Sequence, residues 1–257
     1  MQGTGRKCAL ITGAGSGIGA ATSIAFAQAG YDVVINYRSN RDGAEAVADQ
    51  CRAEGVEAIT VPGDIASDEA CKSIADTAAQ RFGRIDALVN NAGVTRYAPA
   101  DDLDSSDASD FEHIFSVNVV GTYQMIRAAA PHLKKVELGS IVNISSDSAF
   151  SGDGSSIAYA ASKGAINTMT VGLARSLAPA IRVNAVCPGF VDTTWALSWH
   201  DEDSYGVFRE KLIAAAPLKN IPGAPDIADA VLWLSDRATK VSGQCLVIDS
   251  GMHLAIG

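Results

Sequence analysis

Tyr159 and Lys163 lie four residues apart in the stretch AYAASKGAINTMT, residues 158–170. Residues four apart share one face of a helix, so the two side chains are expected to be neighbours. A phenol with an ordinary pKa of about 10 is a poor proton donor or acceptor at neutral pH. A lysine ammonium beside it favours the phenolate and would lower that pKa by up to roughly three units before desolvation opposes the shift. The pair is therefore a candidate for acid–base catalysis, and the alternative interpretation is a lysine stem that merely covers a surface tyrosine.

Glycines recur in TGAGSGIG, residues 12–19, directly after the apolar run CALI. In this position Gly13 would permit a tight turn, Gly17 would let the backbone approach a pyrophosphate, and Gly19 would let a helix pack closely on a strand. The start of that helix supplies free N–H groups and the positive end of the helix dipole. A strand before the glycines and a helix after them therefore predict a dinucleotide site, whereas a flexible turn without a ligand is the alternative.

These side chains need a scaffold, and short apolar runs alternate with helical patterns along most of the chain. The runs are CALIT, DVVINY, AITV, DALVN, SIVNIS and IRVNAV, and the helices are expected up to Gly30, over 41–54, 67–82 and 110–131, and around Tyr159. This alternation predicts an α/β fold with a Rossmann-like, doubly wound parallel sheet of about seven strands and helices on both faces. We expect a single domain over residues 1–257, with ligands at the carboxyl ends of the strands.

Residues 190–225 break the alternation, because they contain Trp195, Trp199, Tyr205 and Phe208 among acidic residues and no clean strand pattern. Segments of this length without regular structure are uncommon in compact domains and tend to be functional. The prediction is a substrate loop that acts as a lid, and the alternative is a packed surface excursion.

Composition excludes several function classes. Twenty basic residues against 29 acidic ones give a net charge of −9, which would repel nucleic acid and anionic membranes, so neither partner is expected. The five cysteines form no CxxC pair and the four histidines are scattered, so we expect no disulfide framework and no metal site. Because no leader-like segment or membrane-length apolar run is found, the cytoplasm is the expected location.

The glycine spacing TGxxxGxG resembles that of the short-chain dehydrogenase/reductase family. Further motifs of that family follow in order: NNAG at 90–93, Asn118, Ser146 thirteen residues before Tyr159, YxxxK at 159–163, and Pro188-Gly189. The resemblance extends over essentially the whole chain. It implies an oxidoreductase that interconverts a carbonyl and a secondary alcohol by hydride transfer with a nicotinamide cofactor.

The resemblance also assigns roles to the residues. Tyr159 would be the general acid and base at the substrate oxygen, and Ser146 would hydrogen-bond the same oxygen. Lys163 would also hold the nicotinamide ribose, and Asn118 would support a water that links the lysine to solvent. Cofactor contacts are implied for Gly13, Ser16, Gly17, Ile18, Gly19, Asp64, Ile65, Asn91, Ala92, Gly93, Tyr159, Lys163, Pro188, Gly189, Val191 and Thr193.

Structural alternatives exist for several of these positions. Ser146 lies in a serine-rich stretch where chance could place a serine, and Asn118 could be a buried polar group that satisfies backbone atoms. Asn91 and Gly93 could simply shape a turn. For Asn90 the structural interpretation is preferred, because the family uses this turn largely to stabilise the sheet.

The end of the second predicted strand bears on the choice of cofactor. An NAD site needs a carboxylate there for the ribose hydroxyls, and an NADP site needs a cation for the 2′-phosphate. Tyr37 takes the acidic position and Arg38 and Ser39 follow it. NADP(H) is therefore favoured, with Arg38 on the phosphate and Ser39 assisting, while NAD(H) stays open because Ser16 replaces the family's other common cation.

Within the family the chain looks most like 3-oxoacyl-[acyl-carrier-protein] reductases and bacterial glucose dehydrogenase-like members. Two features oppose an acidic carrier protein: the net charge of −9, and the segment LARSLAPAIRVN, which lacks the arginine usual before strand six. The loop with Trp195, Trp199 and Asp201 favours a neutral, partly apolar carbonyl compound, so the carrier-linked substrate is kept as an alternative. A non-catalytic NADP-binding sensor is the alternative from another class.

The last predicted strand, Cys245 to Asp249, resembles the family's terminal strand, which pairs with another subunit. A homotetramer or homodimer is implied by that resemblance alone.

Overall fold

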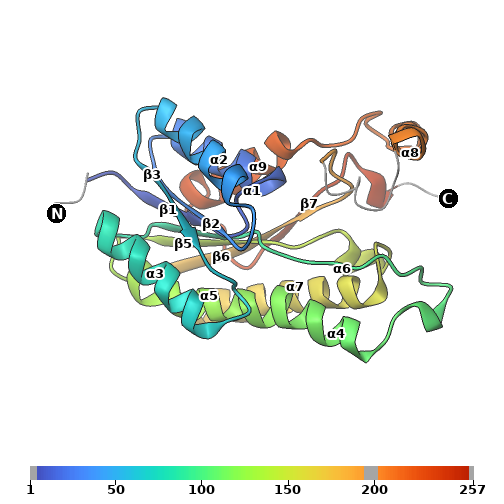
Figure 1. The fold of residues 1–257 in the computed structure, drawn as a ribbon, viewed down its shortest axis with the longest axis horizontal. Helices are drawn as coiled ribbons and strands as arrows, with labels where there is room; N and C mark the ends of the chain where they lie inside the picture. Colours follow the sequence, from blue (N-terminus) through green and yellow to red (C-terminus); the bar gives the residue numbers. More distant parts are fainter. Residues whose placement is uncertain (1–4, 194–201, 255–257) are drawn as a thin grey trace.

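Parallel strands form one sheet in the order β3-β2-β1-β4-β5-β6-β7 (Figure 1). The structure is a computed structural model that describes residues 5–193 and 202–254. The strands are β1 (Cys8–Ile11), β2 (Asp32–Tyr37), β3 (Ala58–Pro62), β4 (Ala87–Asn90), β5 (Gly139–Ile144), β6 (Ile181–Pro188) and β7 (Cys245–Ile248). The chain moves outward in one direction from β1 to β3 and in the other from β4 to β7, so a crevice for a ligand is expected between β1 and β4. The Rossmann-like fold predicted from the sequence is confirmed.

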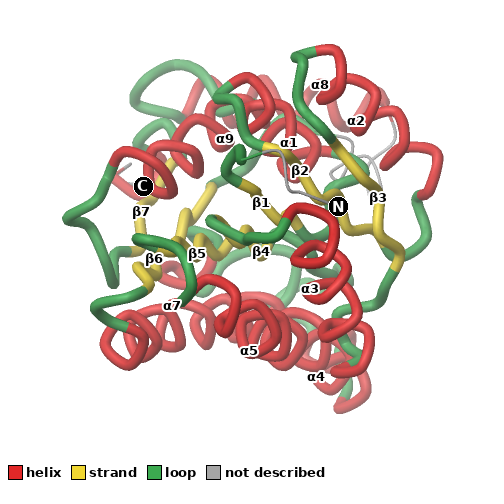
Figure 2. Tube along the Cα trace, turned by 90° about the vertical axis from the view of Figure 1, so that its left-hand side faces the viewer, coloured by secondary structure: helices red, strands yellow, loops and turns green. Residues whose placement is uncertain are grey.

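Helices cover both faces of this sheet (Figures 1 and 2). One face carries α1 (Gly17–Gln28), α2 (Arg41–Ala53) and α9 (Ala224–Leu232). The other carries α3 (Asp68–Phe82), α4 (Ala108–Phe115), α5 (Thr122–Leu133) and α7 (Ile157–Leu177). The remaining helices are η1 (Leu103–Ser105), η2 (Ser116–Gly121), α6 (Ser148–Ser151), α8 (Glu202–Ala215), η4 (Trp233–Arg237) and η5 (Met252–Leu254).

The sheet is buried on both faces because side chains alternate along each strand. In β1, Ala9 and Ile11 pack into the cluster beneath α1, α2 and α9. Cys8 and Leu10 pack into the opposite cluster, beneath α3 and α5. Near-continuous apolar runs of this kind are what a covered parallel sheet requires.

Three elements differ in detail from the prediction. The helix expected over 110–131 is present as a continuous helical stretch, but its middle, the π-helical segment η2, divides it into α4 and α5 and holds Asn118. A 3.6-residue hydrophobic period does not distinguish such a segment from an ordinary helix. Helix α8 lies inside the segment predicted as a loop. The sequence reasoning also named no helix over 224–232, where α9 begins behind a cap in which Asp226 accepts from the Gly223 N–H at 2.7 Å.

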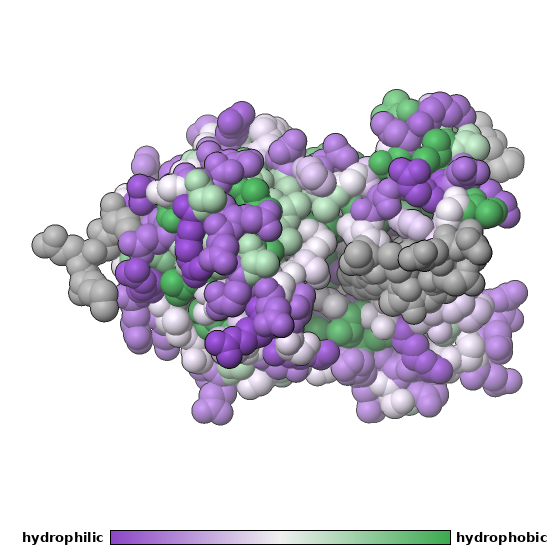
Figure 3. All heavy atoms as spheres, turned by 45° about the horizontal axis from the view of Figure 1, so that its top comes forward, coloured by the Kyte–Doolittle hydropathy of each residue, from purple (hydrophilic) through white to green (hydrophobic). Residues whose placement is uncertain are grey.

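On the face seen in Figure 3, hydrophobic residues form small groups among hydrophilic ones. Within the part of the chain that is described, no helix is both long enough and apolar enough to cross a bilayer.

Candidate active site

A cleft of about 710 Å³ lies at the carboxyl ends of the strands. It brings together most of the residues predicted to bind cofactor or substrate. They are Gly13, Ser16, Gly17, Ile18, Arg38, Ser39, Asp64, Ile65, Asn91, Ala92, Gly93, Ser146, Tyr159, Lys163, Pro188, Gly189, Val191 and Thr193. Of the predicted set, Gly19 and Asn118 are not among the lining residues and lie behind the wall.

The loop between β1 and α1 depends on its glycines. Gly13 and Gly17 adopt φ values of +61° and +55°, a region that residues with a β-carbon rarely occupy. A β-carbon on Gly19 would lie 2.6 Å from the carbonyl oxygen of Gly13, so only glycine lets α1 pack this closely on the loop. Gly19 therefore has the packing role that the sequence predicted.

Asn91 and Thr12 fasten this loop to the end of β4. The Asn91 side-chain amide donates to the carbonyl oxygens of Thr12 and Gly13 at 3.0 and 2.9 Å. Thr12 Oγ1 accepts from the N–H groups of Asn91 and Ala92 at 3.0 and 3.1 Å. Asn90 donates to Asn143 Oδ1 at 2.9 Å and so links β4 to β5, as expected for a sheet-stabilising residue.

The start of α1 fits a dinucleotide pyrophosphate. Helices α2, α3 and α7 begin under side-chain caps from Asn40, Ser67 and Ser156 respectively. At α1 the N-cap residue, Ser16, makes no side-chain cap bond, and the first turn contains no acidic residue. The uncapped end lies at the cleft, so its backbone N–H groups and the positive end of its dipole suit an anionic group.

At the outer end of the cleft, Arg38 follows β2. Its Nη1 lies 4.0 Å from Asp64 Oδ2, and the two side chains are 55% and 44% exposed. Asp64 also accepts from the Ala66 N–H at 2.9 Å. A cation and a carboxylate therefore stand side by side where the adenosine half of a dinucleotide would end.

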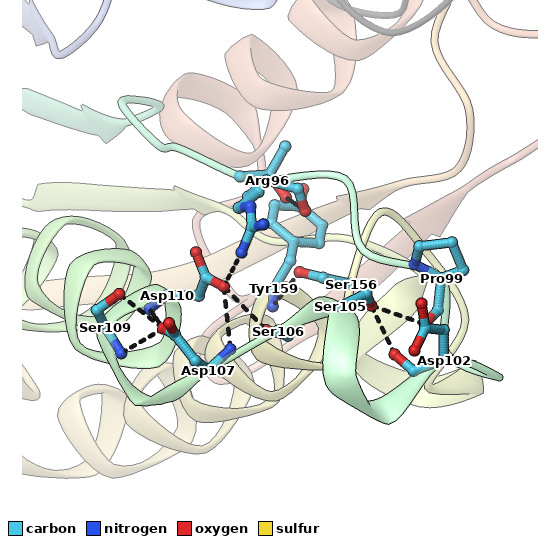
Figure 4. Close-up of polar contacts among 11 residues, drawn as sticks. Arg96, Pro99, Asp102, Ser105, Ser106, Asp107, Ser109, Asp110, Ser156 and Tyr159 are labelled. Atoms are coloured by element: carbon cyan, nitrogen blue, oxygen red, sulfur yellow. Dashed lines mark hydrogen bonds and ion pairs between the residues drawn. The ribbon is translucent and has the colours of Figure 1, made fainter.

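Tyr159 and Ser146 lie together at the end of the cleft opposite Arg38. Tyr159 lies in the first turn of α7, where its N–H donates to the capping hydroxyl of Ser156 at 3.2 Å (Figure 4). A hydrogen bond with Ser146 favours the phenolate form of Tyr159. Lys163 lies one turn further along α7, with Nζ 5.4 Å from the centre of the Tyr159 ring.

The pKa of Tyr159 differs in direction from the sequence-based expectation. Burial raises it to about 12, although the bond with Ser146 opposes the rise. Lys163 is itself buried and donates to the Ile144 carbonyl oxygen at 2.8 Å, and burial lowers its pKa to about 8. In the protein alone the net shift of the Tyr159 pKa is thus upward, opposite to the expectation, because desolvation and the Asp147 carboxylate outweigh the bond with Ser146.

Asn118 is buried beneath this site in η2. Its Oδ1 accepts from the Val94 N–H at 2.8 Å, and its Nδ2 donates to the Val94 carbonyl and to Ser162 Oγ, each at 3.0 Å. These bonds join the loop after β4 to α7. They match the structural alternative named from the sequence, and the role of supporting a water stays a prediction.

The segment between β4 and α4 forms one wall near Tyr159 and is tied down by polar contacts (Figure 4). Asp107 caps α4 by accepting from the N–H groups of Ser109 and Asp110, and Asp110 is paired with Arg96. The Ala98 N–H donates to the Ser155 carbonyl at 2.8 Å.

Part of the predicted substrate loop forms the opposite wall. Phe208 of α8 packs edge to face on Phe190, with ring centroids 5.3 Å apart. Arg209 of the same helix is bonded to Asp192 at 2.7 Å. Trp195, Trp199 and Asp201, on which the apolar-substrate prediction partly rested, lie outside the described residues.

Sequence reasoning missed several residues at the substrate end of the cleft. They are Asp147, Ser148, Ser151, Asp153, Phe190, Leu212, Ile221, Asp249 and Met252. Position relative to Ser146 could have indicated Asp147 and Ser148, because they follow it directly. Ser151 and Asp153 also follow Ser146 closely, and Phe190, Leu212 and Ile221 fall inside the predicted substrate loop, although none of the five was named. Asp249 and Met252 come from a distant segment, and no spacing in the sequence indicates them.

Comparison with known proteins identifies this arrangement. The family model described as "short chain dehydrogenase" matches residues 7–204. The chain belongs to the short-chain dehydrogenase/reductase family. It is 40% identical over 247 residues, 96% of each chain, to a Streptomyces violaceoruber protein that is named, provisionally, as a ketoacyl reductase of granaticin polyketide synthase.

A second relative is the 3-oxoacyl-[acyl-carrier-protein] reductase FabG of Staphylococcus aureus, 34% identical over 96% of this chain and 98% of its own. Among solved structures, a 7α-hydroxysteroid dehydrogenase in complex with NADH and a 7-oxo bile acid has a TM-score of 0.86 and 33% identity. The match covers 93% of that chain and 95% of this one. This short-chain dehydrogenase/reductase is therefore an oxidoreductase that acts on CH–OH or carbonyl groups, and its family uses NAD(H) or NADP(H).

Proposed function

We propose that this protein interconverts a carbonyl compound and a secondary alcohol with NADP(H), and that Tyr159 is the proton donor and acceptor. The observation that carries the proposal is the meeting of Ser146, Tyr159 and Lys163 in the cleft that begins at the uncapped end of α1. When bound, the nicotinamide supplies a hydride for reduction or accepts one in oxidation.

The chain's own residues divide the remaining work. In reduction, the phenol of Tyr159 gives its proton to the substrate oxygen, and a pKa of about 12 keeps that proton in place at neutral pH. The Ser146 hydroxyl donates to the same oxygen and stabilises its developing charge. The Lys163 ammonium favours the phenolate that remains and would hold the ribose hydroxyls.

The preference for NADP(H) rests on Arg38. It is the cation next to the end of β2, and its guanidinium can form two parallel bonds to a phosphate. Its neighbour Asp64 favours NAD(H) to a lesser degree, because a carboxylate can accept from a ribose hydroxyl. NADP(H) is the proposed cofactor, and the alternative is use of both.

The reaction is tested by NADPH consumption over a panel of ketones, quinones, sugar-derived carbonyls and acetoacetyl thioesters, with wild type and Tyr159→Phe. Loss of the general acid is expected to lower kcat by about 10²- to 10⁴-fold while the ring still fills its place. Tight NADPH binding without turnover on any compound would favour the sensor alternative. Turnover that Tyr159→Phe leaves unchanged would refute the assigned role.

Reduction of a 3-oxoacyl group on a carrier protein is the second candidate, favoured by the names of two relatives. The net charge of −9 opposes it, because an acidic carrier would meet a repulsive field. A kcat/KM for acetoacetyl thioesters far above that for free ketones would make it the preferred assignment.

For assembly we propose a homodimer or homotetramer. Helical residues Phe111, Val120 and Tyr123 expose 38, 47 and 47% of their surface, and Val171 on the adjacent α7 exposes 44%. A second copy of the chain would cover such apolar helix faces. Light scattering at low micromolar concentration is expected to give a multiple of 26.6 kDa, and a stable monomer would contradict this. We also expect the cytoplasm as location, where the five free cysteines would stay reduced.

A further inference from the structure

Asp147 lies directly beside the serine proposed to hold the substrate oxygen. Ser146 Oγ donates to Asp147 Oδ1 at 3.0 Å. The other carboxylate oxygen lies over Gly189, where a β-carbon would be 3.3 Å from it. The Asp147 N–H donates to the Pro188 carbonyl oxygen at 2.9 Å, so the end of β6 fixes the residue in the wall of the cleft.

The bond to Asp147 conflicts with the proposed role of Ser146. A serine hydroxyl has a single proton, and it cannot be donated to Asp147 and to a substrate oxygen at the same time. Ser146 Oγ also accepts from the Ser148 N–H at 3.2 Å, and Ser148 Oγ lies 3.0 Å away. The Pro188 carbonyl oxygen, 3.5 Å from Ser146 Oγ, is a further acceptor for this proton. When Ser146 donates to a carbonyl oxygen, Asp147 Oδ1 loses its bond from Ser146 and can accept from a donor on the substrate instead.

The charges at this end of the cleft indicate what that replacement is. Asp147, Asp153 and Asp249 all line it, and Asp249 is already bonded to the N–H groups of Gly251 and His253. Among the described lining residues the basic side chains are Arg38, at the far end, and Lys163. A hydrogen-bond donor suits this environment, because the three carboxylates outnumber Lys163 and would repel an anion.

This inference rests on the proposed function. We propose that Asp147 determines specificity by accepting a hydrogen bond from a hydroxyl on the carbon next to the carbonyl, so that the substrates are α-hydroxy carbonyl compounds and the products vicinal diols. A hydroxyl on the neighbouring carbon can reach Asp147, because Asp147 directly follows Ser146, which binds the carbonyl oxygen. It takes the place of Ser146 at Asp147, and Ser146 then donates to the carbonyl oxygen. The carbonyl carbon gains the hydride and the oxygen gains the Tyr159 proton, while Asp147 neither gives nor keeps a proton.

The test compares 1-hydroxy-2-butanone with 3-pentanone, in which a methyl group replaces the hydroxyl. Wild type is expected to prefer the hydroxyketone by about 10- to 100-fold in kcat/KM, the range for a hydrogen bond to a charged group. 1-Methoxy-2-butanone, which keeps the oxygen but has no proton to donate, is expected to behave like 3-pentanone.

Asp147→Ala is expected to remove the preference. The kcat/KM for 1-hydroxy-2-butanone should fall towards that for 3-pentanone, whereas a merely structural role would lower the values for all three ketones by a similar factor and leave the preference in place. Asp147→Asn keeps the size and one neutral acceptor and is expected to retain a smaller preference. As a matched control, Asp153→Asn removes another carboxylate of the same cleft and should change the preference by no more than about twofold.

A preference that survives in both Asp147 variants, or a wild type that prefers 3-pentanone, would overturn the inference and leave the proposed function standing. Failure of the proposed function looks different: none of the three ketones would be reduced, or Tyr159→Phe would reduce them as fast as wild type.

Discussion

Replacement of Arg38 by alanine should change which cofactor the enzyme prefers. The guanidinium would bond the 2′-phosphate of NADP(H), and such charge-assisted bonds are strong when they are desolvated. Here the Arg38 side chain is 55% exposed and the Asp64 side chain 4.0 Å away is 44% exposed, so solvent screens the interaction. We therefore expect a loss of about 1 to 2 kcal/mol, which corresponds to a factor of about 5 to 30 in kcat/KM for NADPH.

NADH provides the internal comparison, because it has no 2′-phosphate to lose. Its kcat/KM is expected to change by about twofold or less in Arg38→Ala, since an exposed charge contributes little to a neutral ribose. Without Arg38 the phosphate would also face Asp64 with no cation between them, which adds to the loss for NADPH alone. The assay is the ratio of kcat/KM for NADPH to that for NADH at a fixed ketone concentration.

Arg41→Ala is the matched control, because Arg41 is an exposed arginine at the start of α2 and is not among the residues that line the cleft. Its ratio should equal that of wild type. Arg38→Lys keeps the charge but not the planar fork and should fall between wild type and Arg38→Ala. A wild-type ratio near one, or equal losses for both cofactors in Arg38→Ala, would refute the assignment of Arg38 to the phosphate.

Two further predictions concern pH and stability. The rate of ketone reduction, measured as kcat/KM for NADPH, should fall as the pH rises through about 8, because Lys163 loses its proton there while Tyr159, with a pKa of about 12, keeps its own. The rate of alcohol oxidation should instead rise with pH, because oxidation needs the phenolate. A reduction profile that stays flat across pH 8 would contradict the role of Lys163. Ser156→Ala removes the hydroxyl that accepts from the Tyr159 N–H and should lower the free energy of unfolding by about 1 kcal/mol. In urea unfolding this appears as a lower midpoint with an unchanged slope. An unchanged midpoint would show that another group, for example water, replaces the cap.

The fold could be predicted because each strand carries its signal locally. A strand such as DVVINY, residues 32–37, is buried almost throughout, and the apolar run VVI at 33–35 makes it visible in the sequence. The π-helical character of the helix around Asn118 could not be predicted, because such a turn adds a residue without changing which side chains are apolar. Helix α9 was missed for a different reason: it is only 9 residues long and its pattern is continuous with the segment taken as a loop.

The candidate site also has features that the sequence could predict and features that it could not. The spacing of Tyr159 and Lys163 correctly indicated neighbours on one helix, because that depends on helix geometry alone. It could not give the direction of the tyrosine pKa, which depends on how deeply the ring is buried and on the neighbouring Ser146 and Asp147. Burial and side-chain direction come from tertiary packing, and no local pattern reports them.

The same reasoning explains why the reaction class is easier to predict than the substrate. The groups proposed to bind the cofactor's phosphates and to move the proton lie in short contiguous segments, the loop at 12–19 and the helix that carries Tyr159 and Lys163. The substrate end combines Asp147, Gly189, Phe208 and Asp249, which are separated by tens of residues and meet only in the folded chain. Gly189 belongs to a family motif, whereas Asp147 only lies next to a motif residue, and its bond to Ser146 connects the substrate end to the catalytic residues. If that bond must be exchanged before reduction, the choice of substrate and the catalytic step depend on the same proton.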